Sequence, residues 1–377
     1  MQTHLLACGW VPNGLIQSLY LVTHTLQEEA GGWVFCFCSQ RGETDARDES
    51  TADRAPQERK EPWQCLDEVR RFAREGFGAI PPEWLGTYFR WWGVYTQGDG
   101  IGAIGGKGGE GKAVPYFMVR IRVPNGILSS GQLRAISAVA KLHARGVADL
   151  TVRQNVQLHW VSIESLPDVL ETLWRVGLTT QGSCGDDTRN ITGCPLAGLD
   201  ADELCDASPL ARQATELLVG NPAFYNLPRK FKICVTGCRV WCSYPEINDV
   251  GLTAVSRTLN GRLEIGFALH VGGGLSSEPC FAKCLGAFVR WHQALPVIQG
   301  VAEIFRDAGC LRENRERARL KYLFLRHGWT AESFQQELSA AWAFGSSRRW
   351  RFTHRRTLTG TTWAFTLRRR KAPRMWV

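Results

Sequence analysis

The chain has 377 residues, of which 44% are hydrophobic, so it can bury the cores of two ordinary domains and is neither a fibre nor a wholly disordered polypeptide. Its mean hydropathy is −0.19, and no stretch reaches the roughly 18 apolar residues that a membrane helix needs. The net charge of +9 comes from the end of the chain, because residues 346–377 hold ten Lys and Arg residues and no Asp or Glu. The body of the protein is therefore close to neutral, which argues against a general nucleic-acid-binding surface.

The N-terminal region, residues 1–61, ends in a charged linker. Residues 41–62 contain twelve charged residues and no aliphatic or aromatic side chain larger than Ala, so this segment cannot bury a core and is predicted to be disordered. The first 40 residues contain no Lys or Arg and lack the charged start of a secretory signal. We therefore expect a cytoplasmic protein without a membrane partner.

Residues 62–183 are predicted to form the first domain. A helix is expected over 63–77, before Pro81 and Pro82, and an aromatic cluster follows at 88–95. A glycine-rich loop at 98–115 contains a GxGxxG match at 100–105 and a GxxxxGK match at 106–112. Neither has the strand and helix that a nucleotide site needs, so we do not expect nucleotide binding.

The chain then alternates between strand and helix patterns. A strand is expected at 117–123, a helix from Ser130 to Gly146, a strand over 149–162 and a helix from Ser165 to Gly177. This order predicts an α+β, ferredoxin-like half-domain.

Residues 184–340 are predicted to form a second, α/β domain. Strands are expected at 231–235, 249–255 and 263–271, and helices at 297–308, 315–324 and 334–341. Residues 341–377 form the basic tail, which we expect to be a poorly structured end, with RNA binding as the weaker alternative.

Basic and polar side chains recur on separate elements of this neutral body. In the strand at 149–162, four polar residues alternate with mostly apolar ones, a pattern that also fits a strand facing solvent. The others come from the preceding strand and from two later segments, and together they predict a pocket for anions. The residues are Arg120, Arg122, Arg153, Asn155, Gln157, His159, Arg189, Arg229, Lys230 and Lys232.

Several of these segments resemble the sirohaem-dependent nitrite and sulfite reductases. The matching stretches occur in the order of that family and are residues 89–97, 117–124, 151–159, 188–190, 226–232 and 271–276. The resemblance covers about residues 62–340 and only the first of the two pseudo-symmetric halves of which the family is built. If the second half is missing, we expect apolar or glycine-rich surface at 91–92 and 271–275 to be exposed.

The resemblance implies functions for the polar residues. Arg120, Arg189, Lys230 and Lys232 would surround the anion on the distal face of the sirohaem iron, and the lysines would supply protons. Arg153, Asn155, Gln157, His159 and Arg229 would hold the carboxylates of the macrocycle. The implied reaction is reduction of nitrite to ammonia with electrons from a ferredoxin-type donor, and Asn155 favours nitrite over sulfite. Sulfite reduction and an inactive fragment that binds sirohaem or a partner remain alternatives.

The chain has thirteen cysteines, and the sequence does not decide whether they bind the 4Fe–4S cluster of the family. By resemblance, most cluster ligands belong to the missing second half. Here Cys238 and Cys242 have the spacing of one ligand pair, and Cys194 matches one member of the other pair, whose second position is Thr188. Cys184 or Cys234 could replace that ligand. The group is therefore a relic that binds nothing or a true cluster site, and a zinc site is a third possibility, although no histidine lies nearby in the sequence.

Overall fold

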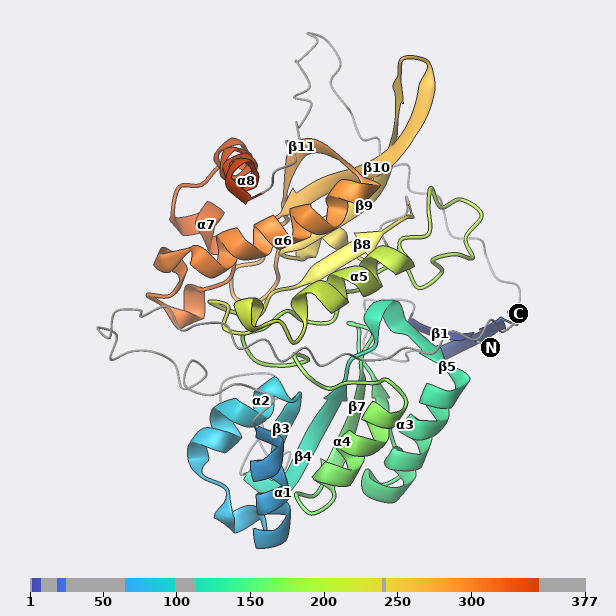
Figure 1. The fold of residues 1–377 in the computed structure, drawn as a ribbon, viewed down its shortest axis with the longest axis vertical. Helices are drawn as coiled ribbons and strands as arrows, with labels where there is room; N and C mark the ends of the chain where they lie inside the picture. Colours follow the sequence, from blue (N-terminus) through green and yellow to red (C-terminus); the bar gives the residue numbers. More distant parts are fainter. Residues whose placement is uncertain (1, 8–18, 25–64, 99–112, 239–241, 346–377) are drawn as a thin grey trace.

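The computed structural model describes residues 2–7, 19–24, 65–98, 113–238 and 242–345. The charged linker, the two glycine-rich motifs and residues 346–377 of the basic tail lie outside these residues, whereas residues 341–345 of that predicted tail belong to a helix. Two layered α/β units stand one above the other (Figure 1), the lower one built around residues 65–183 and the upper one around residues 184–345. None of the helices in the described ranges is long and apolar enough to cross a membrane.

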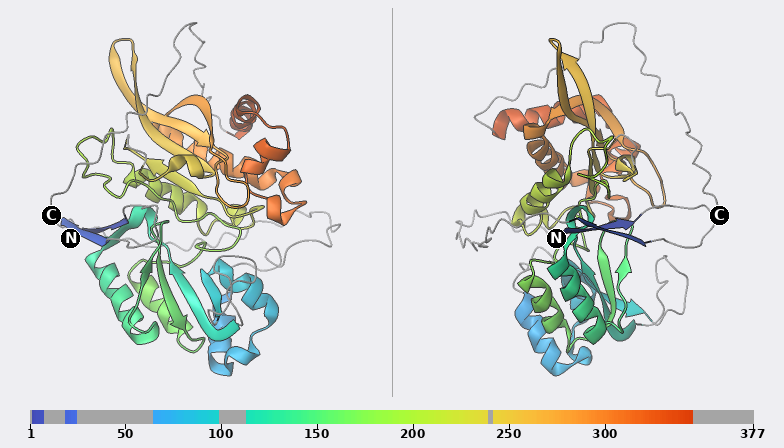
Figure 2. Two further views of the ribbon diagram at one scale, coloured as in Figure 1. Left: turned by 180° about the vertical axis from the view of Figure 1, so that it is seen from behind. Right: turned by 90° about the vertical axis from the view of Figure 1, so that its right-hand side faces the viewer.

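The lower unit contains an antiparallel sheet with helices on one face (Figure 2). The strand order is β3 (Val94–Gly98), β4 (Ala113–Ile121), β7 (Val156–Val161) and β6 (Asp149–Leu150). The helices are α1 (Cys65–Glu75), a π-helical turn at Trp84–Tyr88, α2 (Phe89–Trp91), α3 (Ser130–His143) and α4 (Leu166–Arg175). Phe117, Val119 and Ile121 are fully buried, so the alternate residue Arg120 belongs to the other face of the sheet. The predicted α+β fold is confirmed.

Local capping sets the start of α3. The backbone N–H of Gln132 donates to Ser129 Oγ at 3.2 Å, and Ser129 N–H donates to Gln132 Oε1 at 3.0 Å. This reciprocal capping box makes Ser129 the cap, one residue before the predicted Ser130. The apolar face of the helix ends at Val139, since Leu142 is 76% exposed.

The segment 149–162, expected as strand material, forms two strands, β6 and β7, that are joined by a turn. Thr151 Oγ1 accepts the backbone N–H groups of Arg153 and Asn155 at 3.3 and 3.1 Å, and Gln154 takes a φ of 58°. These contacts close a tight turn between β6 and β7. Arg153 and Asn155 therefore lie on the turn and not on the strand, whereas Gln157 and His159 do lie on β7.

The upper unit is a four-stranded sheet covered by helices (Figure 1). Its order is β11 (Lys283–Arg290), β10 (Arg262–Val271), β9 (Val250–Leu259) and β8 (Ile233–Thr236), and β8 pairs with β9 in parallel. The helices are α5 (Ser208–Leu218), α6 (Trp291–Asp307), α7 (Lys321–Arg326) and α8 (Ala331–Gly345). The sequence did not predict β11 or α5. The helix predicted over 315–324 is a 3-10 turn at Arg315–Arg317 followed by α7.

A small sheet joins the chain start to the lower unit. It has the order β2 (Leu19–His24), β1 (Gln2–Ala7) and β5 (Ile127–Ser129), all antiparallel. This small sheet lies next to the boundary between the two units (Figure 1).

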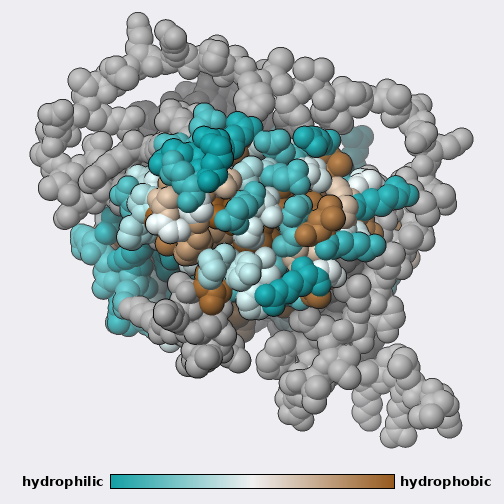
Figure 3. Space-filling model, turned by 90° about the horizontal axis from the view of Figure 1, so that it is seen from below, coloured by the Kyte–Doolittle hydropathy of each residue, from teal (hydrophilic) through white to brown (hydrophobic). Residues whose placement is uncertain are grey.

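The expected exposed surface at 91–92 is not found. Trp91 and Trp92 are 1% and 6% exposed, because Trp91 packs against Tyr225 and Trp92 against Trp174. Of residues 271–275, only Leu275 is exposed. Figure 3, which views the lower unit from its end, shows mostly hydrophilic residues with small, separate hydrophobic areas.

Buried hydrogen bonds hold the two units together. The side-chain amide of Asn190 donates to the carbonyl oxygens of Val123 and Arg153 at 2.7 and 2.9 Å. Arg122 is also buried and donates to Thr188 O at 2.6 Å. Since these carbonyls are shielded from water, each bond would be costly to lose.

We expect Asn190→Ala to destabilise the protein by about 1–3 kcal/mol, because one buried and one partly buried carbonyl oxygen lose their donor. Chemical denaturation followed by circular dichroism measures this change. Gln336→Ala on the exposed surface of α8 is the control and should change the free energy of unfolding by less than about 0.5 kcal/mol. Equal denaturation curves for the Asn190 variant and the unmodified chain would contradict this assignment of Asn190.

Candidate anion and cofactor site

Arg120 is held in a fixed position on the sheet face that the helices leave uncovered. Its Nε and Nη2 donate to Gln157 Oε1 on β7 at 3.1 and 2.9 Å. Its Nη1 donates to Ser183 O at 3.4 Å and to Cys184 Sγ at 3.3 Å. The ring of Tyr95 lies 5.6 Å from the guanidinium carbon. The guanidinium is therefore positioned from both units.

Arg189 reaches the same carbonyl group. Its Nη1 donates to Ser183 O at 3.2 Å and its Nη2 to Gly185 O at 2.8 Å. The chain places it there because Arg189 N–H donates to Phe231 O at 2.7 Å, which aligns this segment with the one carrying the lysines. Arg120 and Arg189 therefore lie next to each other.

The two lysines carry lowered pKa values. Burial and, to a smaller extent, the neighbouring cations Arg189, Arg319 and Arg229 lower the pKa of Lys230 to about 8. Burial likewise lowers the pKa of Lys232 to about 7, assisted by Arg319 and Arg153. A group of cations that destabilise one another's charge favours a bound anion. The structure thus brings all four residues predicted for anion binding into one region.

Two arginines predicted to bind the cofactor border this region. Arg153 donates from Nη1 to Asn248 Oδ1 at 2.9 Å and from Nη2 to Ile233 O at 3.0 Å, and burial lowers its pKa to about 10. Its buried Nε has no partner. Arg229 is paired with the buried carboxylate of Asp186 at 2.9 Å.

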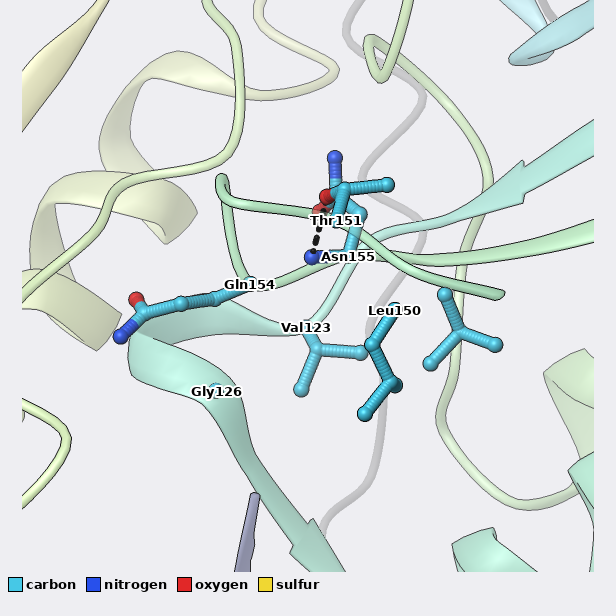
Figure 4. Close-up of a pocket in the computed structure, with 7 residues that line it drawn as sticks. Val123, Gly126, Leu150, Thr151, Gln154 and Asn155 are labelled. Atoms are coloured by element: carbon cyan, nitrogen blue, oxygen red, sulfur yellow. Dashed lines mark hydrogen bonds between the residues drawn. The ribbon is translucent and has the colours of Figure 1, made fainter. Parts of the chain in front are cut away.

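The remaining cofactor candidates are not all together. Gln157 contacts Arg120, and His159 lies next to Gln157 with 3.4 Å between their Nε2 atoms, while the His159 ring also faces Asp149 on the edge strand at 3.3 Å. Asn155 lines a separate small pocket beside Thr151, Val123 and Leu150 (Figure 4). Its side-chain oxygen is buried without a partner.

An ion pair that the sequence analysis missed supports the lysines. Arg319 donates to both carboxylate oxygens of Asp249, at 3.2 and 2.8 Å, and both residues are buried. Asp249 also accepts the backbone N–H of Lys232 at 2.8 Å. Lys321, equally buried, donates to the carbonyls of Leu275 and Glu278. In the sequence, the only sign of these buried cations is the alternation of basic residues at 315–321, which we interpreted as part of a helix.

The cysteines form a group of their own. The sulfur atoms of Cys194, Cys238 and Cys242 all lie within 4.8 Å of one another. Cys184 and Cys234, which the sequence analysis considered as replacement ligands, lie elsewhere: Cys184 contacts Arg120, and Cys234 donates to Ser243 O at 3.5 Å. Neither sulfur belongs to this group, so the replacement stays a prediction that the positions of Cys184 and Cys234 do not support.

Comparison with known proteins identifies two domains of the chain. Residues 184–344 match the family described as the nitrite and sulphite reductase 4Fe-4S domain, and residues 110–175 match the nitrite/sulfite reductase ferredoxin-like half domain. The chain is 38% identical to the assimilatory ferredoxin-dependent nitrite reductase of Haloferax mediterranei, over 75% of this chain and 49% of the relative. It is 37% identical to the sulfite reductase [ferredoxin] 2 of Mycolicibacterium paratuberculosis, over 71% and 47%.

A solved structure agrees with these matches. The structure of the Mycobacterium tuberculosis NirA protein is similar with a TM-score of 0.69 and 35% identity, covering 76% of this chain and 52% of that one. The chain spans about half the length of the curated relatives that it matches. With two matched domains in sequence and a matching fold, the chain belongs to the sirohaem-dependent nitrite and sulfite reductase family.

Proposed function

We propose that this chain forms an anion- and sirohaem-binding half of a ferredoxin-dependent nitrite reductase. The observation that carries this proposal is the convergence of Arg120, Arg189, Lys230 and Lys232 from both units. The names of the relatives support a ferredoxin-type electron donor and an anionic substrate. Because those relatives are about twice as long, we assign the complete reaction to this chain only together with a second half.

The residues present fit sirohaem. The macrocycle carries several carboxylates, and the site offers buried donors without partners, the Nε atoms of Arg90 and Arg153 and the Nη1 of Arg122. Buried donors of this kind are costly unless a ligand satisfies them. Arg153, Arg229 and Gln157 would hold the carboxylates, and Asn155 and His159 would contribute from farther along the turn and the strand. When bound, sirohaem would supply electrons to the substrate.

The described cysteines do not fit the 4Fe–4S cluster that family membership implies. Such a cluster takes four thiolates, each on a different iron. The group contains three thiols, and Cys194 Sγ and Cys242 Sγ are only 3.6 Å apart. We therefore expect the cluster ligands in the second half, and we route no step of the reaction through Cys194, Cys238 or Cys242.

The four central residues can perform two tasks. The two arginines would bind the oxygens of nitrite, since a guanidinium presents paired donors in a planar arrangement. The lysines would deliver protons, because pKa values of about 8 and 7 allow both protonation states near neutral pH. Each N–O bond that breaks consumes protons as its oxygen leaves as water.

Sulfite is the second candidate substrate, since the relatives include both kinds of reductase. An inactive fragment that binds sirohaem or a partner is the third interpretation. We propose that the protein works in the cytoplasm, in agreement with the finding that its described cysteines form no disulfide.

We expect nitrite affinity to fall as the pH rises from 6 to 9, because Lys232 and then Lys230 lose their charge through about pH 7 and 8 while nitrite stays an anion. Isothermal titration calorimetry at several pH values measures this. Lys230→Ala should weaken binding on the order of 10-fold at pH 6.5. The control Lys141→Ala, on the exposed side of α3, should leave binding unchanged. Equal losses for the two variants would show that the basic residues form only a solvated surface.

A genetic experiment tests the reaction itself. The chain is co-expressed with the second half of the Haloferax mediterranei relative in strains that make sirohaem and lack either nitrite or sulfite reductase. We expect growth on nitrite as nitrogen source, lost with Arg189→Ala and kept with Arg134→Ala, an exposed arginine on α3. If growth is restored only in the strain that lacks sulfite reductase, the substrate is sulfite and not nitrite. Failure of both rescues, with both halves present and soluble, would favour the inactive fragment.

A further inference from the structure

The thiol group lies apart from the reaction proposed above and has a geometry of its own. We propose that Cys194, Cys238 and Cys242, together with Asp200, bind a single tetrahedral zinc ion. Two of the three cysteines are buried, and they form a small cluster with Ala197. The third, Cys242, is exposed and leaves a path by which an ion can enter.

The sulfur positions match one shared ion. Zinc binds thiolate at about 2.3 Å, so two thiolates on one tetrahedral ion stand about 3.8 Å apart. Cys194 Sγ and Cys242 Sγ are 3.6 Å apart, and all three sulfurs lie within 4.8 Å of one another. Three soft thiolate ligands this close together favour zinc among the common divalent ions.

Asp200 lies beside the group and would move toward the ion to become its fourth ligand, because its oxygens do not belong to the set of atoms that all lie within 4.8 Å of one another. Its Oδ2 lies 3.6 Å from Cys238 Sγ, close to the separation of about 3.5 Å expected for a sulfur and an oxygen on the same zinc ion. Its other oxygen, Oδ1, accepts the backbone N–H of Asp202 at 3.0 Å. That bond orients the carboxylate, as the outer partners of metal ligands commonly do.

The backbone holds the two buried cysteines in place. Each follows a glycine that packs too closely for any side chain: a Cβ at Gly193 would lie 2.0 Å from Asn125 Oδ1, and one at Gly237 would lie 1.7 Å from Cys205 O. The N–H of Cys238 donates to Thr236 Oγ1 at 3.1 Å. The ligands are therefore largely positioned before any ion binds, which lowers the entropy cost of binding.

Other uses of the thiols fit less well. A cubane cluster separates its thiolates over different irons, farther apart than ligands that share one ion. A disulfide between Cys194 and Cys242 would use two sulfurs and leave Cys238 and Asp200 without a role. A zinc ion accounts for all four groups and would join two segments 48 positions apart in the chain.

The test uses the full chain, purified without metal-chelating tags or chelators. Inductively coupled plasma mass spectrometry should find close to one zinc ion per chain and no stoichiometric iron. Exchange with cobalt(II) should give the intense visible absorption of a tetrahedral thiolate complex. Adding zinc to the chelator-treated chain should raise its melting temperature.

The variants separate ligation from folding. Cys194→Ser and Cys238→Ser should lose the zinc and the cobalt spectrum, while Cys284→Ser, an exposed cysteine on β11, should keep both. Asp200→Asn can still accept the N–H of Asp202 and should fold, yet its zinc affinity should fall on the order of 10-fold. Circular dichroism confirms that each variant is folded.

Three results would overturn the proposal. One is a folded chain that binds neither zinc nor cobalt. Another is iron with acid-labile sulfide that the same Cys→Ser variants abolish. The third is a zinc affinity that Asp200→Asn and Cys238→Ser leave unchanged. None of these measurements depends on nitrite or sirohaem, so the zinc site and the proposed reductase function can fail separately.

Discussion

The rest of this structure depends on one constraint: several cationic side chains are buried together with too few carboxylates to neutralise them. Burial, together with the neighbouring cation Arg319, lowers the pKa values of Arg153, Lys230 and Lys232, so the folded chain holds their charge at a cost. The bidentate Asp249–Arg319 pair offsets part of that cost. The remaining excess of charge is what an anion or a polycarboxylate cofactor would neutralise. Burial, together with that excess, lowers the pKa values of Lys230 and Lys232 to about 8 and about 7.

Main-chain oxygens, more than side-chain carboxylates, set the positions of the cations. Arg120 and Arg189 share the carbonyl of Ser183, Arg122 binds that of Thr188, and Arg153 that of Ile233. A carbonyl is neutral, so it orients a guanidinium and leaves its positive charge in place, whereas a carboxylate would cancel that charge. The site can therefore be both ordered and strongly cationic.

Much of this arrangement could be predicted from the sequence, and the failures have identifiable causes. Periodicity located α1, α4 and β4, because their apolar residues face a single core. It failed at 151–155, where Thr151 bonds to nearby backbone and breaks the strand, and at 315–324, where Arg319 is drawn into a buried pair. The spacing of Cys194, Cys238 and Cys242 in the sequence predicted that they form one group. Only the distances between their sulfur atoms can distinguish a site for a single ion from a cluster site.

The hydrogen bonds of Asn190 and Arg122 have a consequence for selectivity. They cross the boundary between the two units and are buried, so the units cannot swing about a hinge without breaking them. A pocket whose walls are fixed in this way cannot close to fit its ligand. For the substrates proposed above, discrimination between the bent nitrite ion and the pyramidal, bulkier sulfite ion would then come from the preset spacing of the four cationic groups, and a small change in the loop at 183–185 would alter it.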